Sequence, residues 1–339
     1  MLRKVVKVVD AKKLEVFDEP VREMGPHDML VKITMSGICR SEFPTYLGEG
    51  AMCMKGPYGI PVITDTVPYP AEFGHEPTGV VLEVGSEVKR FKPGDRISGA
   101  CGGAFASIVT VSEFAPFVVL PDNVSEYNIL AEPVMCCCNI VNDVKPEPDQ
   151  WISVVGCGYM GLICISLLKG YGVENIVAID KIADRREQAI ALGAKYAFDS
   201  DEEAVAKCYE LTGGKGFDRS IELSQSLKGL YFATHTIKIP TPDDRGKIAA
   251  SSVYDLHENW PVQLGFELMN HTPELHFIHP GYAANTPELM KQSVDAHASG
   301  ILPEDRLITH RFKAEDMHKA YEMMVDHDLS YLKGALVFE

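Results

Sequence analysis

The chain has 339 residues, of which 46 % are hydrophobic and 24 % charged, so a globular protein with two domains is expected. Its net charge of −16 excludes nucleic acid as an expected partner, because an acidic surface repels phosphate groups. The sequence holds no apolar run of about 18 residues, which argues against a segment that spans a membrane.

The first part of the chain, up to about residue 125, alternates short apolar runs with turn-forming residues and predicts a mostly β region. The opening segment MLRKVVKVVDAKK has no sustained apolar stretch and no small-residue cleavage site. It predicts a strand rather than a secretory signal, so we expect a cytoplasmic protein. The predicted strands are VKVVD, LEVFD, LVKITMSG, TGVVLEVG, DRISGA, ASIVTV and FVVLP.

From residue 133 onward, predicted helices and strands alternate at the spacing of βαβ units. Helix PVMCCCNIVNDV precedes strand WISVVG, helix CGYMGLICISLLKGYG, strand NIVAID, helix KIADRREQAIALG and strand KYAFD. FDRSIELS, GKIAASSV and ELHFIH predict later strands of the same sheet. This pattern is typical of a parallel sheet with helices on both faces. Two amphipathic stretches follow after residue 280, TPELMKQSVDAHASG and AEDMHKAYEMMVDHD, and then the strand GALVFE.

The nine cysteines are an odd number, and Cys136, Cys137 and Cys138 are adjacent. Free thiols in a reducing compartment fit this arrangement better than a disulfide framework does. Successive residues of a helix point about 100° apart, so three neighbours do not converge on one metal ion. We interpret these three cysteines as small buried residues of a helix.

The stretch VVGCGYMG places Gly156, Gly158 and Gly161 in the spacing G-x-G-x-x-G, with Tyr159 and Met160 between the last two. A predicted strand precedes the motif and a predicted helix follows it, which is the context of a dinucleotide-binding loop. The helix N-terminus supplies free N–H groups and partial positive charge to a pyrophosphate. The alternative is a Rossmann fold that binds a flavin or no cofactor at all.

Asp180 ends the next predicted strand, about 20 residues after the glycines, where a carboxylate accepts hydrogen bonds from ribose hydroxyls. A carboxylate there repels a 2′-phosphate, so we expect NAD rather than NADP. Lys181 and Arg185 complicate this expectation, because positive charge nearby tolerates that phosphate.

Four residues of the chain suggest a metal site. Cys39, His75 and Glu76 are all competent ligands of zinc, and Glu132 is a further candidate just before the βαβ region. Three protein ligands leave one position of a catalytic zinc open for substrate or water. The alternatives are a buried apolar thiol at position 39, a turn-capping Glu76, and an ordinary helix-start carboxylate at Glu132.

Several motifs together resemble the zinc-dependent medium-chain alcohol dehydrogenases, in particular their polyol (sorbitol) dehydrogenase-like branch. These are GICRSE, GHEPTGVVLEVGSEV, FKPGDRI and RLITHRFKAEDMHKAYEM, and the similarity spans essentially the whole chain. The resemblance implies an α/β protein with a GroES-like, mostly β catalytic domain and a Rossmann domain that binds NAD. The expected boundaries are 1–132 with 279–339 for the catalytic domain and 133–278 for the Rossmann domain.

The resemblance also implies residue roles. Cys39 and His75 are expected zinc ligands, Glu76 is expected as a ligand or at the edge of the metal, and Glu132 is expected to bind zinc or its water. Ser41 is expected to pass the alcohol proton outward. Arg40 is expected at the cofactor pyrophosphate, with an ordinary surface charge as its alternative, and Glu42 is expected to support the metal site.

The implied reaction is the reversible oxidation of a secondary alcohol, a polyol or sugar-derived alcohol, to a ketone by hydride transfer to NAD. The zinc acts as a Lewis acid that lowers the pKa of the alcohol. The alternatives are a redox-neutral isomerisation or elimination with tightly held NAD, and a non-catalytic NAD-binding protein. A homodimer or homotetramer is expected, because relatives associate through edge strands of the cofactor sheet.

The sequence departs from the family at three places. The region that holds a second, structural zinc in many relatives contains only Cys101, so a single catalytic zinc is expected. The segment between Cys39 and His75 is longer than usual, and its residues 48–70 are expected near the substrate mouth or at a subunit contact, or as a plain surface insertion. No histidine follows Ser41 closely, which leaves the last step of proton release to water or a ribose hydroxyl.

Overall fold

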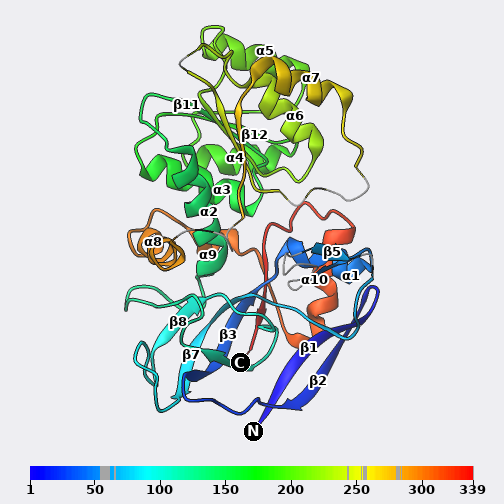
Figure 1. Cartoon of the computed structure of the whole chain (residues 1–339), viewed down its shortest axis with the longest axis vertical. Helices are drawn as coiled ribbons and strands as arrows, with labels where there is room; N and C mark the ends of the chain where they lie inside the picture. Colours follow the sequence, from blue (N-terminus) through cyan, green and yellow to red (C-terminus); the bar gives the residue numbers. More distant parts are fainter. Residues whose placement is uncertain are drawn as a thin grey trace. The chain divides into compact units, whose positions relative to one another are not determined.

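A computed structural model describes residues 1–53, 62–64, 66–242, 244–252, 254, 258–279, 283 and 285–338. The chain forms two compact units, each with its own sheet structure (Figure 1). Unit 1 comprises Met1–Pro133, Ser293–Ala298 and Pro303–Glu339, and unit 2 comprises Val134–Gln292 and Ser299–Leu302. The predicted roles, a catalytic domain for 1–132 with 279–339 and an NAD-binding domain for 133–278, remain predictions.

Unit 1 is mostly β, as predicted. Its strands are β1 (Leu2–Asp10), β2 (Lys13–Pro20), β3 (Asp28–Gly37), β4 (Ala51–Cys53), β5 (Val62–Thr64), β6 (Ala71–Glu72), β7 (Glu76–Val84), β8 (Arg96–Gly99), β9 (Ile108–Ser112), β10 (Phe117–Val119), β17 (His310–Phe312) and β18 (Gly334–Val337). The seven strands predicted in this region are confirmed as β1, β2, β3, β7, β8, β9 and β10. In β9, Val109 and Val111 are buried and their neighbours are less so, which is the two-residue alternation of a strand with one face in the core.

The short helices of unit 1 are η1 (Arg40–Glu42), α1 (Phe43–Leu47), α9 (Glu304–Leu307), η4 (Ala314–Asp316) and α10 (Met317–Val325). Tyr321 of α10 is fully buried and stacks on Tyr46 of α1, with ring centroids 4.4 Å apart. Its ring also lies against Phe73, at 6.2 Å between centroids. Through these contacts α1 and the segment just before β7, which contains Phe73, pack against the same buried ring.

The main sheet of unit 1 has the order β10-β8-β7-β3-β18-β17, and β9 also pairs with β3. The strand β3 therefore lies between β7 and β18, both of which run antiparallel to it. Gly37 at the end of β3 is opposite Glu76 of β7 on one side and opposite Ala335 of β18 on the other. Glu76, Gly37 and Ala335 therefore lie side by side on three neighbouring strands, although Ala335 comes from the end of the chain.

Unit 2 has a six-stranded parallel sheet, in the order β13-β12-β11-β14-β15-β16. Its strands are β11 (Trp151–Val155), β12 (Asn175–Ile179), β13 (Tyr196–Phe198), β14 (Arg219–Glu222), β15 (Lys247–Ala250) and β16 (Glu274–Phe277). The helices are α2 (Ala131–Val144), which begins in unit 1, α3 (Tyr159–Gly170), α4 (Ala183–Ala191), α5 (Glu202–Leu211), α6 (Leu227–Thr236) and α7 (Val262–His271). A further helix, α8 (Thr286–Ala298), runs from unit 2 into unit 1. The predicted parallel sheet is confirmed.

Helices cover both faces of this sheet. One core cluster joins Val155, Val177 and Ile179 of the strands with buried residues of α5, α6 and α7. The helix α3 contacts β11 and β12, and Figure 1 shows α3 and α6 on opposite sides of the strands. None of the helices in the described part of the chain combines the length and the apolar character that a bilayer crossing requires.

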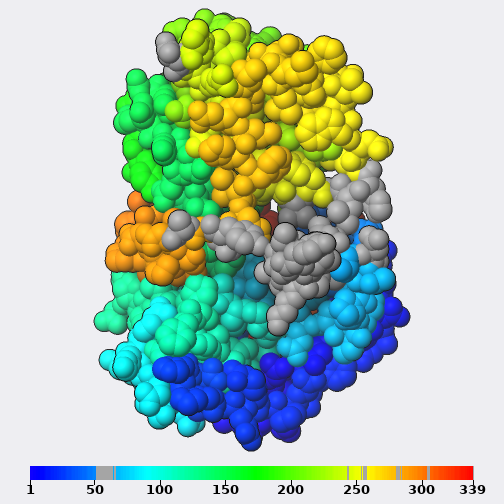
Figure 2. Space-filling model, viewed as in Figure 1, coloured from blue at the N-terminus to red at the C-terminus, as the bar shows by residue number. Residues whose placement is uncertain are grey.

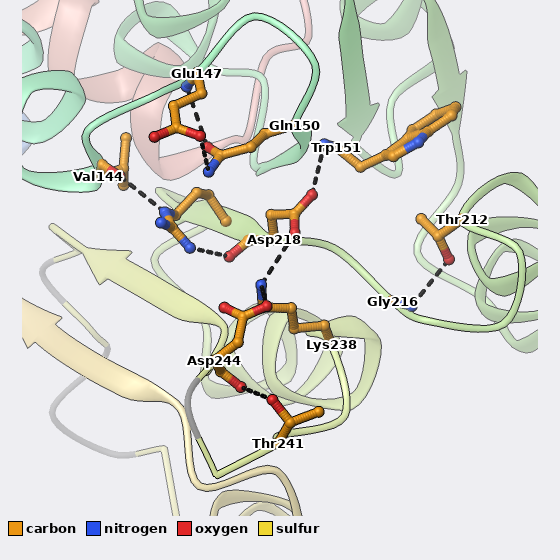
Figure 3. A network of polar contacts seen from close by, with 11 residues as sticks. Val144, Glu147, Gln150, Trp151, Thr212, Gly216, Asp218, Lys238, Thr241 and Asp244 are labelled. Carbon is orange, nitrogen blue, oxygen red and sulfur yellow. Dashed lines mark hydrogen bonds and ion pairs between the residues drawn. The ribbon is translucent and has the colours of Figure 1, made fainter.

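A polar network closes the edge of the sheet at which the strands begin (Figure 3). Asp218 accepts hydrogen bonds from the backbone N–H of Trp151, at 2.9 Å, and from Nζ of Lys238, at 3.1 Å. Lys238 also pairs with Asp244 at 2.6 Å. This network lies at the amino ends of the strands. The glycine motif lies at the opposite end of the sheet, after the carboxyl end of β11.

The three adjacent cysteines lie in α2, and each is at most 6 % exposed, which confirms their prediction as buried helix residues. Burial raises the pKa of Cys138 to about 12, so this thiol stays protonated at neutral pH. The eight cysteines whose side chains the structure describes are free thiols. The group in α2 is therefore part of the packing of unit 2.

Candidate metal centre and dinucleotide loop

Cys39 lies two residues after the end of β3 and immediately before the single turn η1. The turn is closed by a hydrogen bond from the backbone N–H of Glu42 to the carbonyl of Cys39, at 3.2 Å. This turn brings the hydroxyl of Ser41 beside the thiol. The hydroxyl of Ser41 donates to Sγ of Cys39 at 3.2 Å, so the sulfur already serves as an acceptor.

His75 is positioned by its neighbours on both sides. Gly74 has a positive φ of 89°, and a Cβ there would lie 2.4 Å from the backbone nitrogen of Phe105, so only glycine fits. Oε1 of Glu42 accepts from the backbone N–H of Gly74 at 2.8 Å and lies 2.9 Å from Nδ1 of His75. In the tautomer in which Nδ1–H donates to this carboxylate, Nε2 keeps the lone pair that a metal ligand needs.

The ligand atoms of Cys39, His75 and Glu76 all lie within 4.8 Å of one another, and in the described residues they are the only group of this kind. Burial alone lowers the pKa of His75, but hydrogen bonds and charge interactions with Cys39 and Glu42 outweigh it and raise this pKa above its usual range. The pocket therefore favours positive charge. A thiolate, an imidazole and a carboxylate at this spacing fit a zinc ion.

Lys333 completes this pocket, and the sequence analysis did not identify it. Its Nζ lies 2.8 Å from Oε1 and 2.6 Å from Oε2 of Glu76, and it donates to the carbonyl of Ile38 at 3.1 Å. Burial by itself lowers the pKa of Lys333, but the charges of Glu76 and Cys39 raise it above its usual range. A lysine just before a short strand carries no local signal of such a role.

Two further predicted residues lie outside the three-residue cluster. Glu132 is in the first turn of α2, and its role as a ligand remains a prediction. The guanidinium of Arg40 lies over the ring of Phe43, 4.9 Å from its centroid, and its contact with the pyrophosphate also remains a prediction. Glu42, expected to support the site, contacts His75 as described above.

The inserted segment 48–70 lies partly outside the described residues. Its described part contains β4 and β5, which pair antiparallel as a two-stranded sheet. Its predicted place near the substrate remains a prediction.

In unit 2 the glycine motif forms the loop between β11 and α3, at the carboxyl end of the central strands. Gly156 has a φ of 91°, and a Cβ on Gly161 would lie 2.0 Å from the carbonyl oxygen of Gly156. Gly158 caps α3, and a Cβ there would meet no atom within 4 Å. The open space beside Gly158 lies at the N-terminus of α3, whose first turn begins with Tyr159 and Met160, and this arrangement fits a pyrophosphate.

Asp180 follows β12 and is held in a fixed orientation. Its Oδ2 accepts from the backbone N–H of Cys157 at 2.7 Å, and its Oδ1 accepts from that of Ile182 at 2.8 Å. Arg185 lies 4.0 Å from Oδ2, whereas Lys181 is exposed. Each carboxylate oxygen keeps a lone pair after these bonds, so Asp180 can still accept from ribose hydroxyls.

Comparison with known families gives two matches along the chain. The family described as "Alcohol dehydrogenase GroES-like domain" matches residues 25–122. The family described as "Zinc-binding dehydrogenase" matches residues 160–234. The first match contains Cys39, His75 and Glu76, and the second begins at Met160, within the glycine motif.

Individual proteins are similar over most of the chain. The (R,R)-butanediol dehydrogenase of Bacillus subtilis (strain 168) is 32 % identical over 239 residues, which cover 62 % of this chain and 67 % of that protein. The L-threonine 3-dehydrogenase of Shigella sonnei (strain Ss046) is 27 % identical, with 91 % and 92 % covered. Among solved structures, 2R,3R-butanediol dehydrogenase from Bacillus subtilis has a TM-score of 0.80 at 24 % identity, with 99 % and 100 % covered. Galactitol-1-phosphate dehydrogenase from Escherichia coli has a TM-score of 0.81 at 19 % identity, with 99 % and 100 % covered.

Proposed function

This chain belongs to the zinc-dependent medium-chain alcohol dehydrogenases, and from that premise we propose that it oxidises a secondary alcohol to a ketone with NAD. As an enzyme of this family it uses zinc and a nicotinamide dinucleotide. The proposed reaction converts the alcohol and NAD⁺ into the ketone, NADH and a proton. The observation that carries the proposal is the cluster of Cys39, His75 and Glu76, within 4.8 Å, in a chain that also has a complete glycine loop.

In the proposed enzyme Cys39 and His75 hold one zinc ion, with Glu76 and Glu132 as carboxylates beside it. When bound, the zinc lowers the pKa of the alcohol and the nicotinamide accepts the hydride. Glu42 keeps the proton of His75 on Nδ1, so the ring presents Nε2. Ser41, whose hydroxyl lies 3.2 Å from Sγ of Cys39, receives the alcohol proton on Oγ and passes it to water or to a ribose hydroxyl.

The loop of Gly156, Gly158 and Gly161 is proposed to hold the pyrophosphate on the N-terminus of α3. Asp180 is proposed to select NAD, because its fixed carboxylate accepts ribose hydroxyls and repels a 2′-phosphate.

Replacement of Asp180 tests this selection. Asp180→Ala should lower the preference for NAD over NADP by about 10–100-fold, because a hydrogen bond to a charged group contributes about 1.5–3 kcal/mol. The measurement is the ratio of kcat/KM with the two cofactors. Asp180→Asn is the matched control for shape, and it should also lower the preference because it removes the repelling charge. An unchanged ratio in both variants would show that Asp180 does not contact the ribose.

The proposed substrate is a polyol or a related compound with a polar group beside the secondary alcohol. The relatives named for butanediol and for L-threonine support this class, since both names describe a hydroxyl compound with a second polar group. Glu132 and the lone Cys101, which resemble the polyol branch, point in the same direction.

The test is the absorbance of NADH while purified protein with zinc and NAD⁺ meets a panel of alcohols. The panel contains diols, polyols, sugar acids, hydroxy amino acids and plain secondary alcohols. A rise with one class supports the proposal and names the substrate type. Protein that contains zinc and binds NAD but gives no NADH with any class would favour a redox-neutral reaction with retained cofactor.

We also propose that the enzyme is a homodimer or homotetramer that associates through an apolar surface of unit 2. This surface, the α7 patch, consists of side chains that are each at least 53 % exposed: Trp260, Val262, Phe266, Met269 and Phe277. Val262, Phe266 and Met269 lie on one face of α7, at spacings of four and three residues. The adjacent strand β16 pairs only with β15 in the described sheet, so its outer edge is available to a second copy.

A charged substitution in the α7 patch should break this association. Phe266→Glu is expected to shift the protein to a smaller species, because it would bury an unpaired charge in the interface. Light scattering after size-exclusion chromatography measures the mass. Leu329→Glu is the matched control, since Leu329 is as exposed as Phe266, at 64 %, but lies in unit 1. Equal masses for wild type and Phe266→Glu would contradict the proposed interface. The segment that carries the patch, drawn in yellow and light orange, lies at the surface of unit 2 (Figure 2).

A further inference from the structure

A buried carboxylate lies at the carboxyl end of the sheet of unit 2, and the reaction as proposed so far gives it no role. Glu222 is the last residue of β14 and is 0 % exposed. Its Oε1 accepts hydrogen bonds from the backbone N–H of Ser224, at 2.8 Å, and from the hydroxyl of Ser224. Its Oε2 accepts from the hydroxyl of Tyr254 at 2.5 Å. Both carboxylate oxygens therefore have donors, and these fix the orientation of the group.

The sheet places this carboxylate beside the glycine loop. In the order β13-β12-β11-β14-β15-β16, the chain extends from β11 to one side through β12 and β13, and to the other side through β14. Ligands of open parallel sheets bind beyond the carboxyl ends of the strands at such a switch point. Glu222 is opposite Val155, the last residue of β11. A Cβ on Gly156 would lie 2.6 Å from backbone atoms of Leu223 and Ser224, so the turn after β14 packs directly against the glycine loop.

The two halves of a dinucleotide extend to opposite sides of this switch point. In the proposed cofactor site the pyrophosphate lies on the N-terminus of α3, and the adenosine ribose lies at Asp180, directly after β12. From the pyrophosphate, the half that carries the nicotinamide then extends in the other direction, toward β14. The turn 223–225, which directly follows Glu222, is the backbone that this half meets on that side.

The segment after β15 holds this turn through several side chains. The hydroxyl of Ser252 accepts from the backbone N–H of Gln225 at 3.1 Å. Gln225 has a positive φ of 62°, which a residue other than glycine keeps only when its surroundings hold it. The carboxylate of Glu258 accepts from the backbone N–H of Leu227, the first residue of α6, at 2.9 Å. Tyr254 lies between Ser252 and Glu258 in the sequence, so three residues of one segment contact β14 and the turn that follows it.

The ionisation of the two groups supports donation from tyrosine to glutamate. Burial and the charge of Glu222 raise the pKa of Tyr254, so its hydroxyl stays protonated at neutral pH. Burial also raises the pKa of Glu222, whereas the hydrogen bonds from Ser224 and Tyr254 oppose this rise. Loss of the tyrosine hydroxyl therefore removes one of the donors that stabilise a buried charge, and such a donor contributes more than a donor to a neutral group does.

We propose that Tyr254 and Glu222 are positioning residues that hold the turn 223–225 in the shape required by the nicotinamide half of the cofactor. The hydroxyl of Tyr254 fixes the carboxylate, and the carboxylate fixes the backbone N–H and the hydroxyl of Ser224. The adenosine half depends on Asp180 and the glycine loop, so the pair acts on one half of the cofactor only. The inference rests on the proposed function in one respect, namely that a nicotinamide dinucleotide binds at the glycine loop.

The test is isothermal titration calorimetry of the full-length, zinc-loaded protein with two ligands, NAD⁺ and ADP. ADP contains the adenosine and both phosphate groups but lacks the second ribose and the nicotinamide. Tyr254→Phe should lower the affinity for NAD⁺ about tenfold, because a hydrogen bond to a charged group is lost. The affinity of this variant for ADP should stay within about twofold of the wild type.

Tyr209→Phe is the matched control, because it removes a phenolic hydroxyl that also donates within unit 2. The hydroxyl of Tyr209 donates to the carbonyl of His235 at 2.8 Å. His235 lies in the last turn of α6, and α6 begins near the carboxyl end of β14 and runs away from it. The control should keep both affinities within about twofold of the wild type.

A double variant shows whether the hydroxyl acts through the carboxylate. The affinity of Glu222→Gln for NAD⁺ is compared with that of Glu222→Gln combined with Tyr254→Phe. Because a neutral amide gains less from the tyrosine hydroxyl than a carboxylate does, the second change should lower the affinity by less than about threefold.

Four results would overturn the inference. These are wild-type affinity of Tyr254→Phe for NAD⁺, equal losses for NAD⁺ and ADP in that variant, an equal loss for NAD⁺ in Tyr209→Phe, and a full tenfold loss when Tyr254→Phe is added to Glu222→Gln. If Glu222→Gln does not fold, the comparison of Tyr254→Phe with Tyr209→Phe still decides. A wild type that binds neither NAD⁺ nor ADP would instead refute the proposed cofactor site itself.

Discussion

Cys39→Ser should abolish turnover while it leaves dinucleotide binding largely intact. The thiolate of Cys39 is the softest ligand of the cluster with His75 and Glu76, and a serine hydroxyl does not replace it at neutral pH. Loss of a residue that merely supports a metal ligand costs about 10–100-fold, so loss of the ligand should exceed about 100-fold in kcat/KM. Metal analysis should show that the variant has lost its zinc.

Cys101→Ser is the matched control, since Cys101 is a thiol of the same unit that lies close enough to His75 for the charge of His75 to lower its pKa. Burial outweighs this charge and raises the pKa of Cys101 to about 12, which makes it a poor ligand. The control should keep both zinc and activity. Retained turnover in Cys39→Ser, or loss of zinc in both variants, would contradict the proposed mechanism.

Gly156→Ala should destabilise unit 2 as a whole. Its φ of 91° belongs to the left-handed region, and a Cβ would lie 2.6 Å from backbone atoms of Leu223 and Ser224. The conformation costs about 1–2 kcal/mol and the overlap about 1–3 kcal/mol. Against a total stability of about 5–15 kcal/mol this is a large fraction. Thermal unfolding with and without NAD measures the effect.

Gly158→Ala is the contrasting variant two residues away. No atom lies within 4 Å of the Cβ position, and the φ of −70° suits alanine, so stability should change by less than about 0.5 kcal/mol. The added methyl group occupies the space proposed for the pyrophosphate, so NAD affinity should fall at least about tenfold, or 1.4 kcal/mol. Equal NAD affinity in Gly158→Ala and the wild type would contradict the proposed cofactor loop.

Local patterns of the sequence predict much of the fold. Each strand of the first region is a short apolar run between turn residues, and the structure confirms all seven. The loop between β11 and α3 was predictable because its glycines meet local steric requirements. Gly156 has a positive φ, and Gly161 lies close to the carbonyl oxygen of Gly156. Signals of this kind need no knowledge of the rest of the chain.

Helices that connect later strands were not identified from the sequence. The helix α6, with the sequence LKGLYFATHT, contains a glycine, two aromatic residues and two threonines, all of weak helix propensity. Seven of its ten residues are buried, among them Leu230 and Phe232, so tertiary packing rather than propensity stabilises it. The apolar stripe on α7 was missed as well, because it faces solvent in this chain.

At the candidate site, the cysteine and the histidine stand in recognisable motifs, and the structure brings both together with Glu76. Lys333 could not be found in this way. It lies 257 residues from Glu76. Nothing near it in the sequence distinguishes it from a lysine that is exposed to solvent. Its position follows only from the pairing of β18 with β3, which is a property of the whole sheet.

The same pairing has a consequence for how the protein is made. Unit 1 contains segments from before and after unit 2, and β18 inserts between β3 and β17. A ribosome therefore releases Cys39, His75 and Glu76 well before it reaches Lys333, and the whole of unit 2 emerges in between. Since domains generally fold as they are synthesised, unit 2 can fold while the sheet of unit 1 still lacks β17 and β18. During that interval the nascent chain holds the two proposed metal ligands, Cys39 and His75, while the carboxylate of Glu76 still lacks its contact with Lys333, and the pocket is complete only when β18 pairs with β3.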